Sequence, residues 1–138
     1  ASESLLRSST LGAEDRPEAA FSRGLAYPLS GNVRQAIADW TPLAKQSDNL
    51  YGAKAAVYLA EALLAQGDKT EAQNVAERFV NSGTPHSYWL ARGFITLSDI
   101  YRARGKNYEA KEYLKALREN YPGTEPDIFI MIDERLAK

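Results

Sequence analysis

Apolar residues recur along most of this chain with the spacing of an α-helix. One such stripe comprises Ala53, Ala56, Val57, Ala60, Leu63 and Leu64, and a second runs through Tyr88, Leu90, Phe94, Leu97 and Tyr101. No stretch alternates apolar and polar residues long enough to predict a strand. Turn-forming residues separate the helical stretches, as in Ser82-Gly-Thr-Pro85. The pattern therefore predicts helices at about 2–11, 17–30, 33–47, 50–66, 69–82, 87–104, 107–120 and 126–137.

Small residues repeat at regular intervals across these helices. Alanines recur 36 and 38 residues apart, at Ala36, Ala72 and Ala110, and each follows a glycine by five residues, at Gly31, Gly67 and Gly105. Glycine adopts positive φ easily and so ends a helix, whereas alanine lets two helices approach closely. Each repeat thus predicts two antiparallel helices joined by a tight turn, and the fold class is all-α.

The repeats resemble those of the tetratricopeptide repeat family, a helix–turn–helix unit of about 34 residues. Gly67-Asp68 with Glu71-Ala72, and Tyr121-Pro122, match that pattern most closely. The periods here are longer, and Leu43, Phe79 and Leu117 stand where the family often has a small residue. The resemblance implies a right-handed superhelix of antiparallel hairpins with a C-terminal capping helix. The long, irregular repeats are also similar to those of bacterial cell-envelope repeat proteins.

The same repeats predict one domain spanning residues 1–138. We expect a half hairpin at 1–12, hairpins at 17–48, 50–84 and 87–122, and a capping helix at 126–138. The half hairpin resembles a second helix without its first, so we expect the chain to be the C-terminal segment of a longer protein. The capping helix should cover the helix at about 107–120 with its apolar side, namely Ile128, Ile132 and Leu136.

Composition and charge argue against several classes of function. The net charge of −1 and the lack of a basic stripe disfavour nucleic acid, including RNA bound by helical repeats. The sequence has no run of about 18 apolar residues, so we expect no direct membrane insertion. There is no cysteine, and His86, in a turn, has no catalytic neighbour along the sequence. We therefore expect no enzyme activity, no metal and no cofactor; an enzyme would need a cluster of titratable groups that the chain does not provide.

The tetratricopeptide resemblance implies a non-catalytic scaffold that binds a protein or an extended peptide on its concave face. In that family the first helix of each hairpin lines this face. By offset, we expect partner-binding residues at Phe21, Leu25, Lys54, Val57, Glu61, Arg92, Ile95, Asp99 and Arg102. Lys54 and Arg92 should be neighbours that gain nothing from each other, so a partner's acidic residue should bind there. An apolar residue of the partner should bind near Phe21 and Leu25.

Two alternatives in function and three structural details stay open at this stage. The chain could be a regulatory or targeting segment of a larger bacterial envelope protein, and it could bind RNA. The compartment is not fixed: the envelope resemblance favours the periplasm, and the sequence also allows the cytoplasm.

Trp40 is expected in the core, Trp89 against the preceding hairpin, and Pro42 inside a helix that it would kink.

Overall fold

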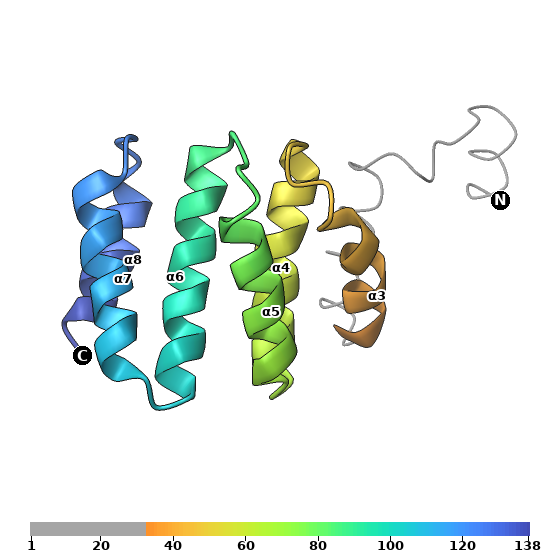
Figure 1. The fold of residues 1–138 in the computed structure, drawn as a ribbon, viewed down its shortest axis with the longest axis horizontal. Coiled ribbons are helices and arrows are strands. Elements are labelled where there is room, and N and C mark those ends of the chain that lie inside the picture. Colours follow the sequence, from red (N-terminus) through yellow and green to blue (C-terminus); the bar gives the residue numbers. More distant parts are fainter. Residues whose placement is uncertain (1–32) are drawn as a thin grey trace, which may run out of the picture.

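The structure is a computed structural model that describes residues 33–138, and this part of the chain is helical without strands. Its helices are α3 (Val33–Leu43), α4 (Leu50–Ala65), α5 (Lys69–Val80), α6 (Ser87–Ala103), α7 (Asn107–Asn120) and α8 (Pro126–Leu136), shown in Figure 1. The expected helices at about 2–11 and 17–30 lie outside the described residues. The all-α prediction is confirmed for the described part.

The turn within each hairpin forms as the glycine spacing predicts. Gly67, with φ of 86°, follows the end of α4, and Gly105, with φ of 82°, follows the end of α6. At the first turn the amide of Asp68 donates to the carbonyl of Leu63, a bond that only a left-handed residue at position 67 permits so tightly. The Asp68 side chain then accepts from the amide of Glu71 at 3.2 Å and begins α5.

Helix α3 ends four residues earlier than the pattern predicts, at Leu43 rather than at about residue 47. Pro42 lies in its last turn, where it has no amide hydrogen to donate to the carbonyl four residues earlier. The backbone continues in tight turns, with Lys45 donating to the carbonyl of Pro42. The helix thus ends one residue after Pro42 and does not continue as a longer, kinked helix. The other described helices end within two residues of their predicted limits.

The helices form two layers with different spacing. The first helices of successive hairpins contact each other in order, α4 against α6 and α6 against α8. The second helices α3, α5 and α7 contact first helices but not one another. Figure 1 shows α4 behind α5 and α8 behind α7. We call the surface of α4, α6 and α8 the inner face, because these first helices contact one another in succession.

Small residues lie where the helices touch. Ala36, Ala72 and Ala110 are all fully buried, as the repeat pattern predicts. Glycine serves the same purpose at position 93, since a Cβ there would lie 2.8 Å from the Phe79 ring. Trp40 is 2% exposed, which confirms its predicted place in the core. Close approach of the helices therefore depends on side chains of minimal size at repeated positions.

Helix α8 covers a second apolar cluster at the C-terminal end of the stack. Ile128 and Ile132 are fully buried and pack with Leu114 of α7 and with Ala91 and Ile95 of α6. The sequence predicted contact with α7 but not with α6. Helix α8 therefore packs against both helices of the preceding hairpin, as α6 packs against α4 and α5.

Candidate partner-binding surface

A cluster of aromatic and cationic side chains lies near the start of α4 and α6. The Lys54 ammonium lies 5.7 Å from the centre of the Trp89 ring, and the Arg92 guanidinium lies 5.3 Å from it. Lys54 also lies 5.2 Å from the Tyr51 ring, and Arg92 lies 5.9 Å from the Tyr88 ring. The negative face of an aromatic ring attracts cations at such distances. Trp89 thus holds cations from two successive hairpins on one surface.

These aromatic residues belong to a row that crosses the stack. Ring centres lie 5.8 Å apart from Trp40 to Tyr58, 6.0 Å from Tyr58 to Trp89 and 5.1 Å from Trp89 to Tyr88. The Tyr88 hydroxyl donates to a carboxylate oxygen of Asp127 on α8. The row therefore joins α3, α4, α6 and α8 side by side. Trp89 packs on α4, as expected, with Tyr58 and the cluster around Val57.

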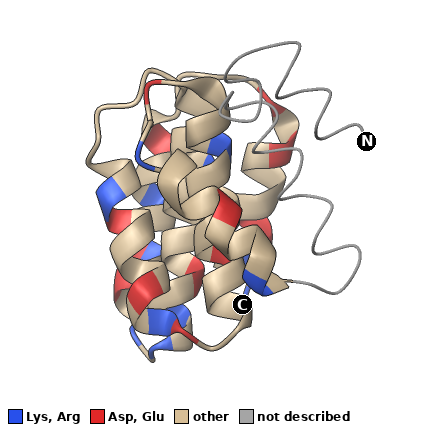
Figure 2. Ribbon diagram, turned by 90° about the vertical axis from the view of Figure 1, so that its right-hand side faces the viewer, with Lys and Arg blue, Asp and Glu red and all other residues tan. Residues whose placement is uncertain are grey.

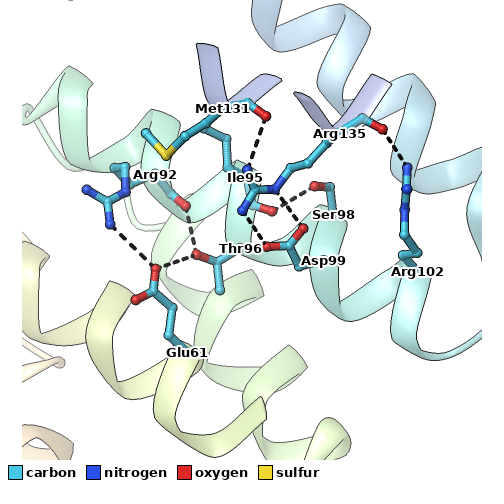
Figure 3. Close-up of polar contacts among 9 residues, drawn as sticks. All are labelled: Glu61, Arg92, Ile95, Thr96, Ser98, Asp99, Arg102, Met131 and Arg135. Carbon is cyan, nitrogen blue, oxygen red and sulfur yellow. Dashed lines mark hydrogen bonds and ion pairs between the residues drawn. The ribbon is translucent and has the colours of Figure 1, made fainter. Parts of the chain in front are cut away.

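Glu61 and Arg92 form an ion pair across α4 and α6, as Figure 3 shows. The Arg92 nitrogen lies 3.6 Å from the Glu61 carboxylate, and the Thr96 hydroxyl donates to the same oxygen at 3.4 Å. The Arg92 side chain is 19% exposed and that of Glu61 is 40% exposed. Arg92 therefore has an anionic partner within the molecule, because its long side chain reaches the acidic position on the adjacent helix.

The protonation of this pair reflects both burial and charge. Partial burial raises the pKa of the Glu61 carboxyl above its ordinary value, and outweighs the opposing effect of Arg92. Burial works against the charge of Arg92, but a hydrogen bond to Tyr88 and the charge of Glu61 raise its pKa further. The arginine thus stays cationic, whereas the carboxylate opposite it is held charged less firmly than usual.

Asp99 and Arg102 are used within the molecule to hold α8. Arg135 donates to both carboxylate oxygens of Asp99, at 2.8 and 3.0 Å, and Arg102 donates to the backbone carbonyl of Arg135 at 3.0 Å (Figure 3). The hydrogen bonds to Asp99, and then its charge, raise the pKa of Arg135. Two-pronged arginine–carboxylate contacts fix orientation as well as distance. These two residues therefore join adjacent first helices.

The remaining sequence-predicted site residues, apart from Asp99 and Arg102, fall into three groups. Lys54, Glu61 and Arg92 lie together on the inner face. Val57 and Ile95 are 1% and 2% exposed, so the expectation that they line a binding surface does not hold for them. Both side chains are buried between helices. The expectation failed because an offset along a helix does not distinguish the exposed stripe of that helix from the adjacent buried one. Phe21 and Leu25 lie outside the described residues.

Comparison with known protein families identifies the repeats. The tetratricopeptide repeat model matches residues 54–82 and 96–124, which cover most of the α4–α5 hairpin and of the α6–α7 hairpin. The chain carries tetratricopeptide repeats. Repeats of this family generally mediate protein–protein interaction and are typically non-catalytic. Neither the curated proteins nor the solved structures searched contain a significant match to the chain.

The tetratricopeptide architecture also accounts for residues that the sequence analysis missed. Arg135 follows Asp99 by 36 residues and Thr96 follows Glu61 by 35, close to one repeat period. Residues one period apart on successive first helices are side-by-side neighbours, so this spacing could have paired them. The contact of both cations with Trp89 had no such signal, since it depends on the direction of three side chains.

Other features of these tetratricopeptide repeats have structural roles. The Nε2 atom of His86 lies 2.9 Å from the carbonyl of Asp48, and the Thr84 hydroxyl donates to the carbonyl of Ser47, so both residues connect two interhelical loops.

Residues 33–138 contain no group of three or more side chains suited to hold a metal ion. None of the helices described there is long and apolar enough to span a bilayer. Basic and acidic positions are interspersed over the helices seen in Figure 2.

Proposed function

We propose that the protein is a scaffold whose inner face binds an extended segment of a partner protein. The observation that carries this proposal is the contact of Lys54 and Arg92, from successive hairpins, with the one ring of Trp89. A surface assembled from two repeats and held by its own contacts is organised before a partner arrives. Preorganisation lowers the entropy that binding must overcome. Stacked repeats generally present such extended surfaces to elongated partners.

The surface offers both selectivity and apolar contact area. Lys54 and Arg92 select for charge, and exposed charged contacts are individually weak, about 0.2–1 kcal/mol. The affinity must therefore come mainly from aromatic and apolar contacts, for which tryptophan and tyrosine are the favoured residues at interfaces. Trp89, Tyr88 and Tyr51 supply these beside the cations, and we assign Phe21 and Leu25 to the same surface. In this proposal the scaffold is built from the hairpins at 17–48, 50–84 and 87–122.

Site-specific photo-crosslinking tests which surface binds the partner. A benzophenone-bearing phenylalanine replaces Tyr51 on the inner face, Tyr113 on α7, or Tyr108, which is 73% exposed on α7. All three variants exchange one aromatic residue for another and are matched in that respect. After incubation with a lysate of the source organism, mass spectrometry identifies the crosslinked peptides. We expect crosslinks to a defined segment of one protein from position 51 alone. Crosslinks confined to positions 113 and 108 would reject the inner face.

A further inference from the structure

An apolar groove of about 360 Å³ lies between α3 and α5, away from the inner face. Its apolar lining comes from three helices and includes Ile37 of α3, Leu59 and Leu63 of α4, and Val75 and Phe79 of α5. The last four of these side chains are buried, and α3 and α5 do not contact each other. A side chain that enters the groove would therefore meet apolar atoms from three helices at once.

Charged side chains stand at both ends of this groove. Glu71 lies in the first turn of α5, Arg78 lies in its last turn, and Lys45 follows the end of α3; all three line the groove. The loops that follow α3 and α5 touch, since the Thr84 hydroxyl donates to the carbonyl of Ser47 at 2.6 Å. Both helices thus end at the same side of the stack (Figure 1). One end of the groove is therefore basic and the other is acidic.

These charges are available to a partner and are particular to this groove. No ion pair within residues 33–138 uses the side chain of Lys45, Glu71 or Arg78. Arg78 follows the repeated alanine of α5 by six residues, and Ala116 follows that of α7 by the same number. Ala116 lines the groove beside α6 and α7, whose described lining includes no charged side chain. The repeat itself therefore does not require a cation at the position of Arg78.

We propose that the groove between α3 and α5 binds an amphipathic helix of a partner protein, which lies antiparallel to α3 and α5. An acidic residue in the first turn of the partner helix contacts Lys45 and Arg78, and a basic residue two turns later contacts Glu71. Apolar residues between them fill the groove. The direction follows from helix polarity, because the positive N-terminal end of the partner helix then lies beside the negative C-terminal ends of α3 and α5. This site is separate from the inner face, so the inference does not depend on the proposed function.

The spacing of the charges along α5 favours a helix over an extended segment. Glu71 and Arg78 are seven residues apart, which is a rise of about 10 Å over nearly two full turns, so they lie on the same face of α5. Two charges seven residues apart on a partner helix match this rise and also share one face. An extended segment covers about 10 Å in three residues, and residues three apart point to opposite sides. Only the helix can therefore contact both ends of the groove with one face.

A display selection on the immobilised full chain tests this inference. The probe is a phage library of peptides of about 15 residues, or four helical turns, in a helix-favouring background of alanine and glutamine. Four positions on one face are random: a first position, and those three, four and seven residues after it. We expect enrichment of an acidic residue at the first position, apolar residues at the next two and a basic residue at the last. Selection on the variant Lys45→Glu with Arg78→Glu and Glu71→Lys should enrich the reverse order of charge.

Two tryptophan variants locate the bound peptide. Enriched peptides are synthesised with a fluorophore, and fluorescence anisotropy measures their affinity. Thr41→Trp places an indole at an exposed residue that lines the groove, and should weaken binding about tenfold or more by filling the site. Ala116→Trp places the same indole in the groove beside α6 and α7, and should leave affinity within about twofold. Circular dichroism checks that both variants are folded.

Two charge variants separate the groove from general electrostatics and leave every apolar residue in place. Lys45→Gln with Arg78→Gln should weaken binding about three- to tenfold and flatten its salt dependence. Lys111→Gln with Lys115→Gln removes the same charge from α7 and should leave affinity within about twofold. All four side chains are exposed, so these variants should stay folded.

Three results would overturn this inference. The first is a set of enriched peptides with no fixed order of charge, and the second is a selection that enriches no peptide. The third is an affinity that neither Thr41→Trp nor the Lys45 and Arg78 variant changes. Peptides of this third kind that lose affinity in Arg92→Gln bind the inner face, and they would support the proposed function while excluding the groove.

Discussion

On the inner face, neighbouring first helices contact each other and their charged side chains form ion pairs. On the opposite side, the second helices do not contact one another. Apolar grooves lie on this side of the described helices. One, of about 360 Å³, lies between α3 and α5 and includes Ile37, Val75 and Phe79. The other, of about 380 Å³, lies beside α6 and α7 and includes Leu90, Phe94, Tyr113 and Leu117. We call these the outer grooves.

The difference shows how one repeat produces two kinds of surface. Where helices are in contact, a residue and its counterpart one period later can touch, and Asp99 with Arg135 does so. Where helices are separated, as α3 and α5 are, a groove lies between them. Charge complementarity selects partners, whereas apolar grooves discriminate poorly between them. Specific recognition therefore depends on charged positions, which the inner face has and which, of these two grooves, the one between α3 and α5 has at its ends. Four predictions test how far the two sides differ.

The largest effect is expected from removal of residues 126–138. This deletion takes away Ile128 and Ile132, which are fully buried, and exposes Leu114 and Ile95. Full burial of each isoleucine contributes about 1.5–3 kcal/mol, so stability should fall by about 3–6 kcal/mol and the exposed cluster should promote association. Calorimetry and light scattering measure the two effects.

Ile130→Asn is the matched control for the deletion, because that side chain is 57% exposed on the same helix. Its melting temperature should stay close to that of the wild type. A truncated protein that remains monomeric and equally stable would show that α8 is not part of the folded core.

The next effect contrasts the packed seam with an outer groove. Ala72 is fully buried, so Ala72→Trp forces an indole into a packed seam and should destabilise the fold by about 1–3 kcal/mol or more. Ala116→Trp makes the same change at a residue that lines the groove beside α6 and α7, and should change stability by about 0.5 kcal/mol or less. Thermal melts compare the two. Equal losses would mean that the groove is packed as tightly as the seam.

The fold was predictable from sequence because its main determinants are local. Gly67 and Gly105 mark turns by their own conformational freedom, and the alanine columns mark helix contacts by size. The inner face was only partly predictable. The sequence placed Lys54 and Arg92 together by period, yet it gave no indication that both lie against the ring of Trp89. It also misassigned Val57 and Ile95, because exposure depends on how the next helix is rotated, which no single repeat determines.

A third prediction compares ion pairs on the inner face and on α7. Arg135 and Asp99 are 25% and 34% exposed and bond through two nitrogens, so their coupling should be about 0.5–1 kcal/mol. Lys115 and Glu112 lie 3.8 Å apart and are 60% and 50% exposed, so their coupling should be near zero. Double-mutant cycles with Arg135→Gln, Asp99→Asn, Lys115→Gln and Glu112→Gln give both values from urea unfolding. A larger coupling on α7 would contradict the special role of the inner contacts.

The smallest effect is a pH dependence whose sign differs between two carboxylates. Burial raises the pKa of Glu61 in the folded protein, so its protonated form is favoured by folding. The contribution of Glu61 is therefore fully present below its unfolded pKa and is lost as pH rises through the folded value. Asp133 is opposite, because the hydrogen bond from Arg118 lowers its pKa. Its contribution is present above its unfolded pKa and is lost as pH falls through the folded value.

Urea unfolding between pH 3 and 7 measures both slopes against matched amide variants. The stability of the wild type relative to Glu61→Gln should decrease as pH rises, whereas its stability relative to Asp133→Asn should increase. The two opposite slopes control for the general effect of acid on the fold, since each comparison differs by one carboxylate. A Glu61 slope of the same sign as that of Asp133 would mean that Arg92 outweighs burial and holds Glu61 firmly. Glu61 would then be held in its charged form by Arg92, as Asp133 is held by Arg118.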